Sequence, residues 1–191
     1  MRSMRAKWTA LASLVVLLGC GSDSTGPPVI STLQNDNFTS GGTPGFQGGF
    51  QTGEAAAVRL GPRNAGFTLN KVEFLFGGGG DTTTKTITLT VYSDSGGDNP
   101  GAVLHSADYV RKASDQAMQE IDVTSLNLHV AAHQTIRVAI GFQHTGFPSV
   151  AIDGARTADR NLMNLNIGGW TAGETVGLSG DFIIRAEIAT P

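Results

Sequence analysis

The sequence predicts an all-β fold, an antiparallel β-sandwich of the jelly-roll type in a single domain. Three observations lead to this prediction. Several segments alternate apolar and polar residues with a period of two, as half-buried strands do. Glycine-rich turns separate these segments at short intervals, and the chain contains 26 glycines. No long segment has the 3.6-residue period of a helix, and no repeat of fixed length indicates a propeller or solenoid.

The alternation places the strands one by one. The clearest segments are Ala56 to Leu60, Val72 to Phe76, Ile87 to Val91, Ile136 to Phe142 and Phe182 to Ile188. Shorter candidates are Ala102 to Val110, Ala117 to Val123, Ser149 to Ile152 and Asn161 to Leu165. The stretch from Val29 to Gly53 is expected to combine a first strand with a long loop. Turns are expected at Gly77 to Gly80 and at Ser95 to Gly101.

Two segments need a local explanation. The apolar alternation slips by one position between Leu69 and Val72, which predicts either a β-bulge or a tight turn between two strands. Residues 115–124 are the best candidate for a helix. Within them, however, Ile121 and Val123 alternate with acidic residues, so that a strand is favoured.

The N-terminus has the proportions of an export signal. The basic residues Arg2, Arg5 and Lys7 precede an apolar stretch from Trp8 to Leu18, which is shorter than the roughly 20 residues needed to cross a bilayer. The stretch ends in Leu17-Leu18-Gly19-Cys20, which resembles the lipobox of bacterial lipoproteins.

This resemblance implies that the chain is cut before Cys20, its only cysteine, and that the sulfur of Cys20 carries the lipid. The protein would then be exported and held at a membrane by several acyl chains. An Asp after the cysteine would resemble the inner-membrane retention signal, whereas this chain has Gly21. The outer membrane, on its periplasmic or surface face, is therefore favoured.

Three parts are expected along the chain: a signal peptide at 1–19, the lipidated cysteine with a flexible tether at 20–34, and the β-sandwich at 35–191. The segment from Gly21 to Pro28 is small, polar and ends in proline, as tethers do. The remaining length suits one domain with one core.

The charge balance bears on the partners. Cleavage before Cys20 would remove three of the 13 lysines and arginines and none of the 16 acidic residues, leaving a net charge of about −6. A surface of this sign repels phosphate backbones, and no cluster of basic residues reverses it locally. Nucleic acid is therefore not expected as a partner.

The order of the strands resembles that of adhesin-like or carbohydrate-binding-like jelly-roll modules of secreted bacterial proteins. The matching elements are Glu54 to Leu60, Val72 to Phe76, Thr88 to Asp94 followed by Asn99-Pro100-Gly101, Ile136 to Phe142, and Gly180 to Ala186. The resemblance is carried mainly by spacing, and it transfers no binding residue.

Aromatic residues with a polar tip are the candidate ligand contacts. Trp170 lies in a glycine-rich setting, where an exposed indole could stack on a sugar ring. Tyr92 and Tyr109 are the other two aromatic residues of this kind after the signal. Alternatively, Trp170 caps the open end of the core.

Acidic residues in the predicted turns are candidate ligands for a structural Ca²⁺, and no other cofactor is expected. Calcium takes six to eight oxygens, which loops at one end of a sandwich can supply. The candidates are Asp94, Asp98, Asp153 and Asp181. Turns also favour Asp for backbone reasons alone, and no spacing here matches a known calcium loop.

Two motifs imitate catalytic or metal sites. Asp94-Ser95-Gly96-Gly97 copies the nucleophile segment of trypsin-like proteases, and Ala131-Ala132-His133 copies their general-base segment, but the serine precedes the histidine, which reverses the order of that family. His129 and His133 have a spacing that would bind zinc on a helix, yet the segment reads as extended. We expect a hairpin loop and turn or surface histidines.

The sequence therefore favours a non-catalytic, lipid-anchored envelope or surface protein whose β-sandwich binds a glycan or a partner protein. One alternative is a lipid-anchored accessory subunit of a membrane complex. The other is a hydrolase that pairs carboxylates from separate loops. Its candidate acids are Glu54, Asp94, Asp153 and Asp181.

Overall fold

The computed structural model describes residues 26–191, so that Cys20 and the expected signal peptide lie outside the described residues. The described chain is built from strands, with two short 3₁₀ helices. The strands are β1 (Val29–Leu33), β2 (Gly45–Phe46), β3 (Ala55–Leu60), β4 (Phe67–Phe74), β5 (Phe76–Gly77), β6 (Thr84–Asp94), β7 (Val103–Lys112), β8 (Gln119–Asp122), β9 (Leu128–Val130), β10 (Thr135–Phe142), β11 (Ser149–Ile152), β12 (Asn161–Leu165), β13 (Gly169–Ala172) and β14 (Ile184–Thr190). The 3₁₀ helices are η1 (Thr124–Leu126) and η2 (Gly173–Val176).

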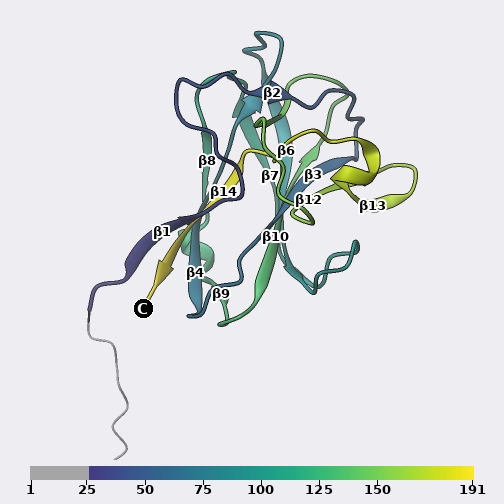
Figure 1. Ribbon diagram of the computed structural model, residues 1–191. Helices are drawn as coiled ribbons and strands as arrows, with labels where there is room; N and C mark the ends of the chain where they lie inside the picture. Colours follow the sequence, from purple (N-terminus) through teal and green to yellow (C-terminus); the bar gives the residue numbers. More distant parts are fainter. Residues whose placement is uncertain (1–25) are drawn as a thin grey trace, which may run out of the picture.

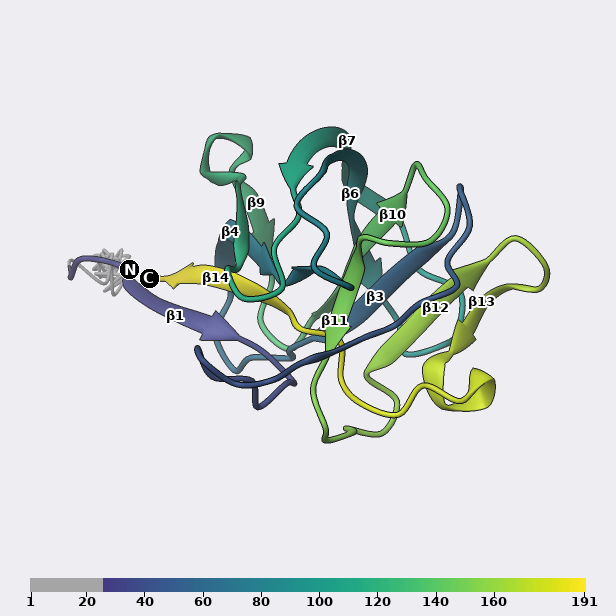
Figure 2. The same cartoon turned by 90° about the horizontal axis from the view of Figure 1, so that it is seen from above.

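The strands form two main antiparallel sheets. The six-stranded sheet has the order β13-β12-β3-β10-β6-β7, which Figure 2 shows across the molecule. The five-stranded sheet has the order β1-β14-β4-β8, with β9 also paired to β4, and the short strands β2, β11 and β5 form a third sheet. This confirms the predicted all-β antiparallel sandwich in a single domain.

The core lies between the two main sheets. Alternate residues of β3, β6 and β10, such as Val58, Leu89 and Ile140, are fully buried there against Val72 and Ile188 of the facing sheet. The period of two in the sequence therefore identified the inner faces of β3, β6 and β10 correctly, because successive residues of a strand point to opposite sides.

The predicted slip in β4 is a β-bulge within one continuous strand. Lys71 pairs with Glu187 and Leu69 pairs with Ile188, which leaves Asn70 without a partner on β14. The Asn70 carbonyl instead accepts a hydrogen bond of 2.8 Å from the N–H of Val123. The extra residue returns the apolar side chains to the core face and ties down the chain before η1.

The first strand expected between Val29 and Gly53 is β1, which pairs along its whole length with β14. The sandwich therefore includes residues 29–33, which the expected division of the chain assigned to the tether. Leu33 is 7 % exposed and belongs to the core. The C-terminal strand thus gains a hydrogen-bonded neighbour, and the C-terminus lies beside the start of β1 (Figure 1).

The segment at 115–124, the best helix candidate, contains strand β8, as its alternation indicated. Among residues 26–191, no helix has the length and apolar character that crossing a membrane requires.

The core predicts the effect of a buried charge. Ile140→Asp would place a carboxylate without a partner at a position that is fully buried between the sheets. We expect the loss of several kcal/mol of stability, enough to unfold a domain of ordinary stability. Circular dichroism and thermal melting of residues 26–191 measure this. The matched control is Val110→Asp, because Val110 is 62 % exposed on β7. A folded Ile140→Asp domain with an unchanged melting temperature would contradict the proposed core.

Candidate functional site

The outer faces of the two main sheets differ in character. On the five-stranded sheet, Lys71 lies between two carboxylates, 3.6 Å from Glu120 and 3.7 Å from Glu187, as expected for a solvated charged surface. On the six-stranded sheet, the outer face of the two central strands carries small residues, including Ala57, Ala139 and Gly141. Such a floor allows another molecule to approach the sheet closely.

Strand register places one residue from each of the six strands in a row across this outer face. Directly paired residues of antiparallel strands point to the same side of a sheet. From β13 to β7 the row is Trp170, Asn164, Ala55, Gly141, Thr88 and Asp108. With neighbouring strands about 4.8 Å apart, the backbone positions span roughly 24 Å. The row begins with an indole and ends with a carboxylate.

A groove of about 300 Å³ lies over this row. Five of the six residues line it, all except Asp108, together with the loop residues before β3 and after β10. The remaining lining residues are Thr52, Gly53, Glu54, Thr90, Tyr92, Ala139, Phe142 and Gln143.

Trp170 and Tyr92 form the aromatic part of the groove. Their ring centroids are 5.9 Å apart and their planes are nearly perpendicular, at 84°. The guanidinium of Arg137 lies over the indole, 5.0 Å from its centroid. Both rings pack on the small apolar cluster of Ala57, Ala139 and Leu162. Neighbours therefore hold the indole in place before any ligand arrives, which reduces the entropy lost on binding.

The other end of the row is polar. The hydroxyl of Thr88 donates a 2.7 Å hydrogen bond to Asp108 and accepts one of 3.0 Å from the side-chain amide of Gln143. Hydrogen bonds from Gln143 and Thr88 hold the pKa of Asp108 below its usual value. The Asp108 carboxylate is therefore ionised at neutral pH.

Glu54 shapes the loop side of the groove. It is 8 % exposed, and its carboxylate accepts hydrogen bonds from the N–H groups of Gln51 at 2.8 Å and Asn166 at 3.1 Å. The side chain of Asn166 in turn donates to the carbonyl of Thr52. Glu54 therefore joins the loop before β3 to the loop after β12, and these loops border the floor.

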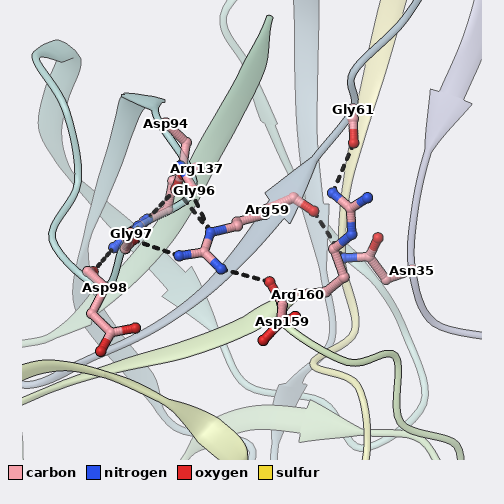
Figure 3. Close-up of polar contacts among 10 residues, drawn as sticks. All are labelled: Asn35, Arg59, Gly61, Asp94, Gly96, Gly97, Asp98, Arg137, Asp159 and Arg160. Carbon is pink, nitrogen blue, oxygen red and sulfur yellow. Dashed lines mark hydrogen bonds and ion pairs between the residues drawn. The ribbon is translucent and has the colours of Figure 1, made fainter.

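A buried cluster of two arginines and one aspartate lies beside the aromatic end of the groove. Arg59 and Arg137 are directly opposite each other on β3 and β10, where two like charges would repel. Asp94 lies between them: its carboxylate is 3.2 Å from Nε of Arg59 and 2.6 Å from Nε of Arg137. Figure 3 shows both guanidinium groups directed toward Asp94. Arg137 is fully buried, and the side chain of Asp94 is also fully buried.

The same cluster holds the loop between β6 and β7. Arg137 donates to the carbonyls of Asp98 at 2.6 Å and Gly97 at 2.8 Å, and Arg59 also donates to Gly97 (Figure 3). Arg59 further reaches the carbonyl of Asp159 at 2.7 Å, which lies just before β12. The predicted turn at 95–101 is thus fixed by side chains from two other strands.

The structure separates the three aromatic residues that the sequence singled out. Trp170 and Tyr92 lie together, but Tyr109 pairs with Ile87, whose side chain belongs to the core, so Tyr109 lies on the inner face. Its hydroxyl is 3.1 Å from Nε2 of His105. Tyr109 cannot therefore share a binding platform with the other two. Trp170 covers the outer face of a sheet and does not cap the end of the core.

The four candidate calcium ligands are in two separate places. The carboxylate of Asp94 forms ion pairs with the two arginines, and the backbone carbonyl of Asp98 accepts a hydrogen bond from Arg137. Asp153 accepts a 3.0 Å hydrogen bond from the N–H of Asp181, whose own carboxylate accepts from Thr157 and Asn161. Within residues 26–191, no three His, Cys, Asp or Glu side chains are grouped as a metal site would require.

The structure brings together the two segments that resemble protease motifs. Ser95 and His133 line one hollow of about 550 Å³ together with Asp94. In the described part of the chain, however, no hydrogen bond joins Ser95 to His133, and Asp94 is paired with arginines. A catalytic triad needs a hydrogen bond from the serine to the histidine and a second one from the histidine to the aspartate. His129 lies on the extended strand β9, as predicted.

The carboxylates considered for a hydrolase are also apart. Glu54 lines the groove, Asp94 lines the other hollow, and Asp153 and Asp181 share loop hydrogen bonds. Sequence reasoning did not single out Arg59, Arg137, Thr88, Asp108 or Gln143. Most of these residues occupy polar positions in the alternating segments, which marks them as candidates for the outer face of a sheet. Only the pairing of the strands shows which of these side chains lie next to one another.

No family model matches the chain, and comparison with curated proteins and with solved structures gave no match either.

Because Asp94 is the counter-charge of the arginine cluster, we expect the stability of the domain to depend strongly on it. Asp94→Asn keeps the side-chain shape but leaves two buried guanidinium groups without a counter-charge. We expect a loss of about 3–5 kcal/mol of stability, measured by urea unfolding. Ser95→Ala is the adjacent control, and together with His133→Ala it should change stability by no more than about 0.5 kcal/mol. Equal stability of Asp94→Asn and Ser95→Ala would show that the cluster does not stabilise the fold.

Proposed function

We propose that this protein is a non-catalytic, lipid-anchored envelope protein that binds a glycan in the groove on its six-stranded sheet. The observation that carries the proposal is the row from Trp170 to Asp108, in which an immobilised indole and hydrogen-bonding side chains border a floor of small residues.

The chemistry of the groove suits a sugar. A pyranose ring presents C–H groups on its faces, which an aromatic ring can contact, and hydroxyl groups around its rim. The groove offers Trp170 and Tyr92 for the faces and Thr88, Asn164 and Gln143 for the hydroxyls. The floor allows the ligand to lie close to the backbone of β10, because Gly141 has no side chain.

A binding role is favoured over catalysis because the acidic side chains have other partners. Glu54 accepts hydrogen bonds from two backbone N–H groups, and Asp94 is paired with two arginines. General acid–base hydrolysis of a glycoside needs two carboxyl groups that face each other across one bond. The loop acids of this domain serve instead to fix the loops.

The fold also separates the groove from the point where the chain enters the domain. β1 begins at Val29, which pairs with Thr190, and Thr190 lies beside Pro62 just after the end of β3. Glu54 and Ala55, at the other end of β3, line the groove. The six residues of β3 span about 20 Å. The groove and the point where the chain enters the domain therefore lie toward opposite ends of β3, so that a lipid at Cys20 would leave the groove accessible.

Filling the groove tests the binding site. A Cβ atom built at Gly141 meets no atom closer than 3.4 Å, an ordinary van der Waals contact, so a valine there projects into the groove. We expect Gly141→Val to bind glycans at least tenfold more weakly on an array and to keep its melting temperature. Trp170→Ala should lose about 2 kcal/mol of binding energy or more.

Thr84→Val is the control for this experiment, because Thr84 is exposed on β6 outside the groove. It should bind like the wild type. Failure of the wild-type protein to bind any glycan, or unchanged binding by a folded Gly141→Val variant, would contradict the proposal.

The lipid anchor is tested separately, at Cys20. We expect Cys20→Ser to remain an uncut, unacylated precursor, because the serine oxygen cannot replace the sulfur that carries the lipid. Mass spectrometry of the N-terminus and partition into a detergent phase measure this. Gly21→Ser is the control and should be processed normally. A Cys20→Ser protein that is cut and membrane-bound like the wild type would contradict lipidation.

A further inference from the structure

We propose that the groove selects uncharged glycans and rejects acidic ones. This inference rests on the proposed glycan-binding function and names the class of glycan. It follows from the charges that border the groove and from the way in which the neighbouring positive charges are covered.

Two carboxylates border the groove on different sides. Glu54 lies on the loop side, where it lines the groove, and Asp108 ends the row on the edge strand β7. Asp108 does not line the groove itself, but it accepts a 2.7 Å hydrogen bond from the hydroxyl of Thr88, which does. An acidic oligosaccharide that extends from Trp170 along the row would bring its carboxylates toward Asp108.

The guanidinium groups near the groove already donate hydrogen bonds to Asp94 and to loop carbonyls, and they are buried. No lysine or arginine is among the described residues that line it. Arg137 lies next to the aromatic end of the groove, but it is fully buried beneath the indole of Trp170. Its guanidinium donates hydrogen bonds to Asp94 and to two loop carbonyls. Its partner Arg59 is bound to the same aspartate. Neither guanidinium can turn toward a ligand carboxylate without breaking the cluster.

The hydrogen bonds at the polar end suit a hydroxyl group. The Thr88 hydroxyl already donates to Asp108 and accepts from Gln143, so that its orientation is fixed. Asp108 is exposed and keeps further lone pairs for donors. A sugar hydroxyl can donate to this carboxylate, whereas the carboxylate of a uronic acid cannot.

Matched oligosaccharides test the selectivity. Hexamers of glucose and galactose are compared with hexamers of glucuronic and galacturonic acid by isothermal titration at low salt. Unit charges 4 Å apart in water repel by ~1 kcal/mol, which corresponds to about fivefold in affinity, so each acidic hexamer should bind at least fivefold more weakly than its neutral counterpart. Raising the salt concentration should reduce this difference, because salt screens exposed charges.

Asp108→Asn identifies the side chain responsible. The amide oxygen can still accept from Thr88, while the negative charge is lost. We expect the acidic hexamers to gain about fivefold in affinity and the discrimination to narrow. Asp122→Asn is the matched control, because Asp122 is also an exposed aspartate that accepts from a threonine, Thr124, but lies on the other sheet. It should leave the discrimination unchanged.

The outcomes separate this inference from the function on which it rests. Binding of neutral and acidic hexamers with equal affinity would overturn the selectivity and leave glycan binding standing. Tighter binding of the acidic hexamers, or equal effects of Asp108→Asn and Asp122→Asn, would also overturn the selectivity. Binding of none of the hexamers, nor of any other glycan on the array, would overturn both proposals.

Discussion

Two arginines face each other on adjacent central strands of this domain, and a single aspartate makes that arrangement stable. Arg59 and Arg137 occupy opposed positions of β3 and β10, and both are buried. Buried charges are tolerated only when they are paired and hydrogen-bonded. Asp94, at the end of β6, supplies the counter-charge, and loop carbonyls take up further N–H groups. The ends of three neighbouring strands and the loop between β6 and β7 are therefore fixed together.

The groove depends on this cluster through Trp170. The indole lies over the guanidinium of Arg137, and Tyr92, which pairs directly with Arg137, meets the indole at a nearly right angle. Because Asp94 and the loop carbonyls hold Arg137, the ring that rests on it is held as well. An aromatic contact that is rigid before binding loses little entropy when a ligand arrives. A structural cluster thus prepares a surface for recognition.

Glu54 gives the second border of the groove in a similar way. Its buried carboxylate joins two loops, one before β3 and one after β12, and these loops border the groove. The same carboxylate and Asp108 leave a negative border with no free basic group among the lining residues. Acidic side chains around a floor of small residues therefore have two consequences. They hold the loops that border the groove, and they lead us to expect a preference for uncharged glycans.

The sequence by itself determined most of the long strands and their inner faces, and it located the irregularity between Leu69 and Val72 without deciding between a bulge and a turn, because these features follow from local alternation of apolar and polar residues. It also named Trp170, Tyr92 and Tyr109 as candidate ligand contacts. It predicted a first strand between Val29 and Gly53 but not its bounds, since β1 shows little alternation and is defined by its pairing with the distant β14. Only the tertiary structure decided that Tyr109 lies on the inner face, that Asp94 pairs with two arginines, and that six residues from six strands form one row. Those facts depend on which strands are neighbours and in what register, and the alternation within a single strand carries no information about either.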